Sequence, residues 1–181
     1  MTWKELQREI TDLGFEKADA LERNKNIIRL AVNRALTVLA SSFRGVRVCE
    51  EVDFDGQTVP NFKETDSLFL RYDSPCLTDK ELNAIPCRLS PLGFIVTDYI
   101  GTAFVNYERG YEKIASDDAD SREIPLDEES ACLLPLLASF YVWQDDDERK
   151  AVRYRNDYES LKGQFLSREL RKTVVNAGEY I

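Results

Sequence analysis

Apolar residues at helical spacing open the chain and predict two helices. In the first helix they are Trp3, Leu6, Ile10 and Leu13. Thr2 and Glu5 form a capping box at its start, in which each side chain bonds a backbone N–H of the other residue, and Gly14 is a typical helix end. A longer helix is predicted over residues 19–43, followed by a stop at Gly45. Its apolar stripe consists of Ile27, Ile28, Ala31, Val32, Ala35, Val38 and Leu39.

Between residues 46 and 124 the pattern changes to one that is typical of strands. Residues 46–54 alternate in part and lead to Asp55-Gly56, the strongest hairpin signal in the chain. Residues 93–107 are dense in β-branched and aromatic side chains, which predicts two strands there. Prolines in the preceding stretch predict a long loop with one short turn of helix near residues 79–84.

The last third of the chain returns to helical spacing. Asp127 is a good N-cap for a helix that continues to Trp143, and Pro135 is predicted to kink it. Asp145, Asp146 and Asp147 interrupt the pattern and favour the start of a final long helix. Steps of three and four residues form an apolar strip on this helix, which requires a partner helix: Ala151, Tyr154, Tyr158, Leu161 and Phe165.

These elements predict an α+β, mainly α fold. We expect a helical bundle, built from the short N-terminal helix and three longer helices, with a β-rich insertion between its second and third helices. The corresponding segments are residues 1–45, 46–124 and 125–170, followed by a C-terminal tail over residues 171–181. This tail lies outside the helical pattern, and Thr173-Val174-Val175 within it favours a strand.

Charge and composition restrict the functions that such a fold serves. The 181 residues include 24 basic and 33 acidic ones, a formal net charge of −9. A protein this acidic gains no free energy of binding from counterion release on nucleic acid. DNA is therefore expected to pass without being bound. No apolar run approaches the length that crosses a bilayer, so no membrane association is expected. The four cysteines form no C-x-x-C pair, and reduced thiols in a protein made in the cytoplasm are favoured over disulfides.

The residues needed for common catalytic sites are missing. The sequence contains no histidine, which removes the commonest general base and metal ligand. It contains neither a phosphate-binding P-loop nor a dinucleotide-binding glycine turn. We therefore expect no enzyme activity, no cofactor and no bound metal.

Three acidic clusters are the remaining candidates for chemistry. Asp117, Asp118 and Asp120 fit a solvated turn better than a site for a hard cation, because the rest of a calcium-loop spacing is missing. Asp145, Asp146 and Asp147 fit a helix start. Glu50, Glu51 and Asp53 fit the exposed face or edge of a strand.

One thiol and four aromatic side chains have two interpretations each. Cys132 lies at a helix start, where a thiol pKa can be lowered, but without a histidine partner a buried structural thiol is favoured. The aromatic residues are interpreted as core before interface: Tyr141, Trp143, Tyr154 and Tyr158.

Strings in the C-terminal third resemble those of the head–tail adaptor proteins of tailed bacteriophages. In order they are Glu123-Ile124-Pro125-Leu126-Asp127, the apolar run from Leu133 to Tyr141, Asp145-Asp146-Asp147-Glu148 and Tyr154-Arg155-Asn156-Asp157-Tyr158-Glu159. The N-terminal helices, with Ala31-Val32-Asn33-Arg34-Ala35, and the returning strand at residues 104–114 are compatible with the same family. The resemblance covers somewhat over half of the chain.

This resemblance implies a virion structural protein at the neck, synthesised in the host cytoplasm. Such subunits form a homo-oligomeric ring, typically a dodecamer, that docks under the portal protein. The ring joins the DNA-filled capsid to the stopper or tail-completion protein, and DNA passes through its lumen. We expect the C-terminal tail to dock onto the portal, by strand addition, through these residues: Thr173, Val174, Val175, Tyr180 and Ile181.

Three other functions compete with the adaptor interpretation. The chain fits another neck or tail-completion protein, for which the family picture is sixfold. It also fits a monomeric cytoplasmic binding module. An enzyme that uses paired carboxylates ranks third, because no spaced pair of acids stands out in an apolar context.

Overall fold

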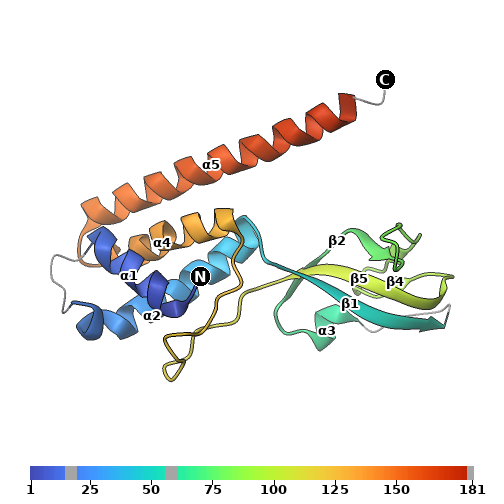
Figure 1. Cartoon of the computed structure of the whole chain (residues 1–181), viewed down its shortest axis with the longest axis horizontal. Coiled ribbons are helices and arrows are strands. Elements are labelled where there is room, and N and C mark those ends of the chain that lie inside the picture. Colours follow the sequence, from blue (N-terminus) through green and yellow to red (C-terminus); the bar gives the residue numbers. More distant parts are fainter. Residues whose placement is uncertain (15–19, 56–60, 179–181) are drawn as a thin grey trace. The chain divides into compact units, whose positions relative to one another are not determined.

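The computed structural model describes residues 1–14, 20–55 and 61–178, which fall into two compact units (Figure 1). The first unit joins both ends of the chain, Met1–Leu39 and Lys113–Ile181. The second unit is the continuous middle, Ala40–Glu112. Each unit has its own elements and its own buried side chains.

The first unit is helical and begins its helices where the sequence predicts. It contains α1 (Trp3–Gly14), most of α2 (Ala20–Ser42), α4 (Glu128–Trp143) and α5 (Glu148–Gly178). The capping box of α1 is confirmed, because the Thr2 N–H donates to Glu5 Oε2 at 2.7 Å and the Glu5 N–H to Thr2 Oγ1 at 3.3 Å. Asp127 caps α4 by accepting the Ser130 N–H at 2.6 Å.

The core of this unit lies where α4 packs against α1 and α5. The predicted strip of α5 is confirmed, since Ala151, Tyr154, Tyr158 and Phe165 are buried and Leu161 is half-buried. From α4 and α1 the most buried apolar residues are Leu133, Leu134, Ala138, Trp3, Leu6 and Ile10. Each large apolar side chain buried in this way stabilises the fold by about 1.5–3 kcal/mol.

The second unit is built on a three-stranded antiparallel sheet. Its strands are β1 (Val46–Asp55), β2 (Phe69–Thr78) and β5 (Ile100–Arg109), in the order β1-β5-β2. Strand β1 pairs with β5 over its whole length, from Val46 opposite Arg109 to Asp55 opposite Ile100. The short helix α3 (Phe62–Thr65) precedes β2, and a ribbon of β3 (Arg88–Leu89) and β4 (Ile95–Val96) lies between β2 and β5 in the chain.

This sheet has a hydrophobic core of its own. Eight buried residues form it: Phe54, Phe62, Cys76, Leu77, Ile95, Ala103, Val105 and Tyr107. The Phe62 ring lies 5.1 Å from the Tyr107 ring, centroid to centroid. The prediction of a mainly α helical bundle that carries an insertion is therefore wrong. The middle segment buries its own apolar face, so the described residues form two units, one helical and one built on a β-sheet.

Several details of the β segment also differ from the predictions. Residue Asp55 does not lead into a hairpin with the next strand, because β1 pairs with β5, which is distant in the sequence. A hydrogen-bonded turn replaces the helical turn that was predicted near residues 79–84, and the Leu82 N–H donates to Asp79 O at 3.0 Å. The two strands predicted within residues 93–107 are present as β4 and β5.

The C-terminal segment continues as helix instead of leaving the helical pattern. Helix α5 runs through Thr173, Val174 and Val175 to Gly178, so these residues are not in a strand. Their side chains lie outside the described residues, as do Tyr180 and Ile181 altogether. Within the described residues, none of the helices has a stretch long and apolar enough to cross a bilayer.

Candidate interaction surface

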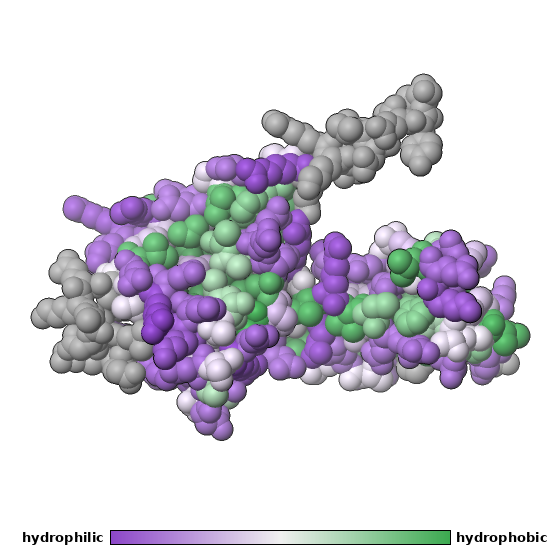
Figure 2. Space-filling view, in the orientation of Figure 1, coloured by the Kyte–Doolittle hydropathy of each residue, from purple (hydrophilic) through white to green (hydrophobic). Residues whose placement is uncertain are grey.

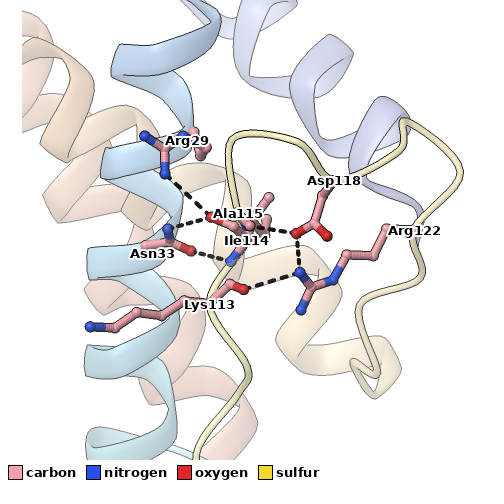
Figure 3. A network of polar contacts seen from close by, with 7 residues as sticks. All are labelled: Arg29, Asn33, Lys113, Ile114, Ala115, Asp118 and Arg122. Atoms are coloured by element: carbon pink, nitrogen blue, oxygen red, sulfur yellow. Dashed lines mark hydrogen bonds and ion pairs between the residues drawn. The ribbon is translucent and has the colours of Figure 1, made fainter.

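The acidic turn before α4 is held by contacts within the helical unit (Figure 3). Asp118 Oδ2 accepts the Ala115 N–H at 2.6 Å and a further hydrogen bond from Arg122 Nη1. Asp120 pairs with Lys25 Nζ at 3.0 Å. The Ala115 N–H, and then the Arg122 guanidinium, hold the pKa of Asp118 below its ordinary value. Asp118 and Asp120 thus have structural partners that fix the turn.

One asparagine of α2 makes two hydrogen bonds to the same loop. Asn33 Oδ1 accepts the Ile114 N–H at 2.7 Å, and Asn33 Nδ2 donates to Ile114 O at 2.9 Å (Figure 3). Arg29 Nη1 lies 3.4 Å from the same carbonyl oxygen. The Ile114 side chain is buried beneath these bonds. Asn33 therefore acts as a two-way clamp that satisfies both backbone groups of Ile114.

The other acidic clusters also serve local structure. Asp147 starts α5, where its Oδ1 accepts the N–H groups of Arg149 and Lys150 at 3.1 Å each, which confirms the predicted helix start. On β1, Glu50, Glu51 and Asp53 are exposed as predicted. Across the described ranges, no three His, Cys, Asp or Glu side chains are grouped so as to hold a metal ion.

The thiol at the start of α4 lies on the surface. Cys132 is exposed, so the expectation of a buried thiol is wrong. Its neighbours Leu133 and Leu134 occupy the positions of the helix that face the core. Periodicity along so apolar a helix does not distinguish its outward positions.

Ionisable groups of the β unit converge around one tyrosine. The Tyr107 hydroxyl lies 3.3 Å from Glu50 Oε2 and 3.3 Å from Asp66 Oδ2, and donates to one of them at a time. Arg109 Nε lies 3.2 Å from the same Asp66 oxygen. Burial first, and then the two carboxylates, raise the pKa of Tyr107 to about 12. The cluster links β1, β5 and the residue that follows α3.

The raised pKa of Tyr107 predicts a loss of stability in alkali. A phenol whose folded pKa lies above its unfolded value stabilises the fold fully below pH 10, and this contribution is lost as pH rises from about 10 to about 12. Between about pH 8 and about pH 11, Tyr107→Phe is expected to remove on the order of 1 kcal/mol of that alkaline destabilisation. The stability of the β unit against urea is measured at about pH 8 and, after brief exposure to alkali, at about pH 11. Amide hydrogen exchange is the readout for the unfolding of this unit. An equal loss of stability in alkali for Tyr107→Phe and for the wild type would contradict this prediction.

Two exposed apolar residues lie together on α2. Ile27 and Leu30 are 48% and 55% exposed. Because they are three positions apart, they share one helical face, and we call them the α2 apolar pair. Ile27 was predicted on the buried stripe, and this is wrong. The stripe is otherwise largely confirmed, because five of its members are buried: Ile28, Ala31, Val32, Ala35 and Leu39. Leu36, which was not predicted, is buried with them. The predicted stripe included Ile27 but not Leu30, so it gave no signal for this exposed pair.

A second exposed set lies in the β unit between β2 and the start of β5. We call residues 82–100 the apolar loop, since it carries five exposed large apolar side chains: Leu82, Leu89, Leu92, Val96 and Ile100. Leu82, Leu92 and Ile100 are each at least 70% exposed. Leu82 also has a positive φ of 67°, a conformation that costs a branched residue energy. Figure 2 shows hydrophobic residues on the surface of both units.

The aromatic residues of α4 and α5 divide between core and surface. Tyr154 and Tyr158 are buried, which confirms them as core. Tyr141 and Trp143 are half-buried, and each has a cation over its ring: Arg34 lies 4.3 Å from the Tyr141 centroid and Lys150 Nζ 4.1 Å from that of Trp143.

Comparison with known proteins adds no family. No protein-family model matches this chain, and no curated protein is significantly similar to it. Function is therefore inferred from the residues and from the two exposed apolar sets.

Proposed function

We propose that this chain is a head–tail adaptor of a tailed bacteriophage, a virion structural protein of the neck. In this proposal it forms a homo-oligomeric ring, with twelve copies expected, that docks under the portal and receives the stopper or tail-completion protein. The observation that carries the proposal is the presence of an exposed apolar set on each unit. The order of the sequence strings from Glu123 to Glu159 supports it.

A ring subunit needs faces that differ from one another. A ring closes through a heterologous interface, in which one surface of a subunit contacts a different surface of the next. The α2 apolar pair supports such a contact, because it would be covered by a second copy of the chain. The apolar loop of the β unit supports a separate contact with the stopper or tail-completion protein.

The charge of the chain fits passage of DNA through the ring. With a formal net charge of −9, a ring of many copies repels the phosphate backbone. DNA would then move through the lumen without binding.

Addition of the purified chain to DNA-filled capsids that lack tails tests the proposal directly. Cryo-electron microscopy is expected to reveal a ring of this chain at the portal vertex. Absence of added density at the vertex would contradict the proposal. A sixfold assembly would identify another neck or tail-completion protein, and a chain that stays monomeric with portal present would favour a cytoplasmic binding module.

Introduction of charge into the α2 apolar pair is expected to prevent ring formation. A variant with Ile27→Asp and Leu30→Asp would place two carboxylates in the interface, which is expected to raise the dissociation constant between subunits by roughly 100-fold or more. Native mass spectrometry with portal present measures the copy number. Gln164→Asp, an exposed change on α5, is the matched control and is expected to assemble normally. Normal assembly of the double variant would exclude this face from the ring contact.

The C-terminal end of α5 is expected to dock onto the portal. Deletion of the residues after Leu170 removes Thr173, Val174, Val175, Tyr180 and Ile181, and is expected to abolish portal binding while the helical unit stays folded. Co-sedimentation with portal measures binding, and circular dichroism monitors the fold. Undiminished binding would exclude this segment.

A further inference from the structure

Two cysteine side chains of the β unit face each other. Cys76 Sγ and Cys87 Sγ lie 2.7 Å apart, although both residues are free thiols in this structure. A disulfide bond is about 2.05 Å long, so bonding requires a movement of less than about 1 Å. The spacing of these cysteines in the sequence gave no reason to pair them.

The backbone holds both cysteines in place. Cys76 is on β2 and is buried in the core of the β unit. Past the turn, the Ile85 N–H donates to Leu77 O at 2.9 Å, and Thr78 pairs with Ala84. The buried Thr97 donates from Oγ1 to Pro86 O at 2.9 Å, directly before Cys87. The two thiols are therefore positioned by surrounding hydrogen bonds.

A pocket lies beside one of the two cysteines. It has a volume of about 340 Å³ and is lined by Pro86, Cys87, Arg88, Val96, Thr97 and Asp98. Cys87 is half-buried, whereas Cys76 is 8% exposed. Burial, and then the hydrogen bond with Cys87, raise the pKa of Cys76 to about 12, so Cys76 is rarely a thiolate near neutral pH. Cys87 lines the pocket and is more exposed, so it is the cysteine that reacts first.

We propose that Cys76 and Cys87 form an intramolecular disulfide when the protein meets a small disulfide oxidant such as oxidised glutathione. The Cys87 thiolate attacks one oxidant sulfur, which forms a mixed disulfide and releases one thiol. Cys76 then loses its proton to water and attacks Cys87 Sγ, and the second thiol leaves. Overall, two cysteine thiols are oxidised and one oxidant disulfide is reduced to two thiols.

The bond would fasten the turn that carries Leu82. This turn is closed by Asp79, whose Oδ1 accepts the N–H groups of Glu81 and Asn83 at 2.8 and 2.9 Å. Closing the segment between Cys76 and Cys87 covalently removes conformations from the unfolded chain. Oxidation thus stabilises one end of the apolar loop against local unfolding.

Tryptic digestion after treatment with oxidised glutathione tests the proposal, because the sequence isolates each cysteine. Cleavage after Arg71, Lys80 and Arg88 places Cys76 in residues 72–80 and Cys87 in residues 81–88. Mass spectrometry without reductant is expected to find these two peptides joined, at the summed mass less two hydrogen atoms. Reductant is expected to separate them.

Three variants make the result decisive. Cys76→Ser is expected to leave Cys87 as a glutathione adduct, at a level roughly tenfold or more above that in the wild type, because the resolving thiol is missing. Replacement of the exposed Cys49 and Cys132 by serine is expected to leave the cross-link unchanged.

In the wild type, hydrogen exchange of residues 79–86 is expected to slow by roughly tenfold on oxidation, and Cys87→Ser is expected to show no change. A persistent glutathione adduct on wild-type Cys87, or a cross-link to Cys49 or Cys132, would overturn the proposal.

Discussion

Replacement of Asn33 by alanine is expected to destabilise the helical unit by about 3 kcal/mol. The change removes the acceptor that lies 2.7 Å from the buried Ile114 N–H. It also removes the hydrogen bond that Ile114 O accepts from Asn33 Nδ2. Each buried backbone group that loses its partner costs about 1–3 kcal/mol. Both tryptophans, Trp3 and Trp143, belong to this unit, so tryptophan fluorescence during urea unfolding reports its stability. A fall in the urea midpoint of about 1 M or more is expected.

Asn26→Ala provides the matched control on the same helix. Asn26 is exposed and accepts one hydrogen bond, from Arg29 Nη2 at 2.7 Å. Its replacement is expected to change stability by less than about 0.5 kcal/mol. Equal losses of stability in the two variants would show that the hydrogen bonds between Asn33 and Ile114 contribute no stability of their own.

Leu77→Ala is expected to destabilise the β unit by about 3 kcal/mol and to leave the tryptophan-detected unfolding of the helical unit nearly unchanged. Leu77 is fully buried in the core of the sheet, and its truncation removes apolar contacts and leaves a cavity. The β unit contains no tryptophan, so amide hydrogen exchange of β1 and β5 measures its stability.

Leu82→Ala makes the same chemical change five residues along the chain, at a side chain that is 78% exposed. It is expected to change the stability of the β unit by less than about 0.5 kcal/mol. A fall in tryptophan-detected stability with Leu77→Ala, equal to that in the β unit, would show that the two units unfold as one.

The helical elements could be predicted because their signals are local. Thr2 with Glu5, Asp127 and Asp147 each bond backbone groups within three residues, so their types and spacing are sufficient to place the helix starts. The α5 strip of Ala151, Tyr154 and Tyr158 follows from helical geometry alone.

The β unit could not be predicted in the same way, because its contacts join distant residues. Asp55-Gly56 resembled a hairpin, yet Phe54 pairs with Gly101. Strand β2 pairs with β5 through two register shifts, which no sequence period encodes. The proximity of Cys76 to Cys87 depends on the turn between them and on the contact from Thr97, so the spacing of the cysteines did not reveal it.

Exposed apolar residues were the part of the candidate surface that sequence reasoning missed. A helical stripe shows which residues share a side, but not how much of that side another element covers. Ile27 continues the stripe of Ile28 and Val32 in the sequence, yet only the latter two are buried. Docking of Thr173, Val174 and Val175 onto the portal remains a prediction.

The first residue of β1 and the last residue of β5 are partners, Val46 opposite Arg109. The chain therefore enters and leaves the sheet at neighbouring positions, one strand spacing or about 5 Å apart. A short glycine-containing bridge from Arg109 back to Val46 would close this module into a circle, and its excision would leave two neighbouring ends to splice. Recombination can exchange such a segment without changing the path of the flanking chain. The β unit can then diversify while the helical unit keeps its packing.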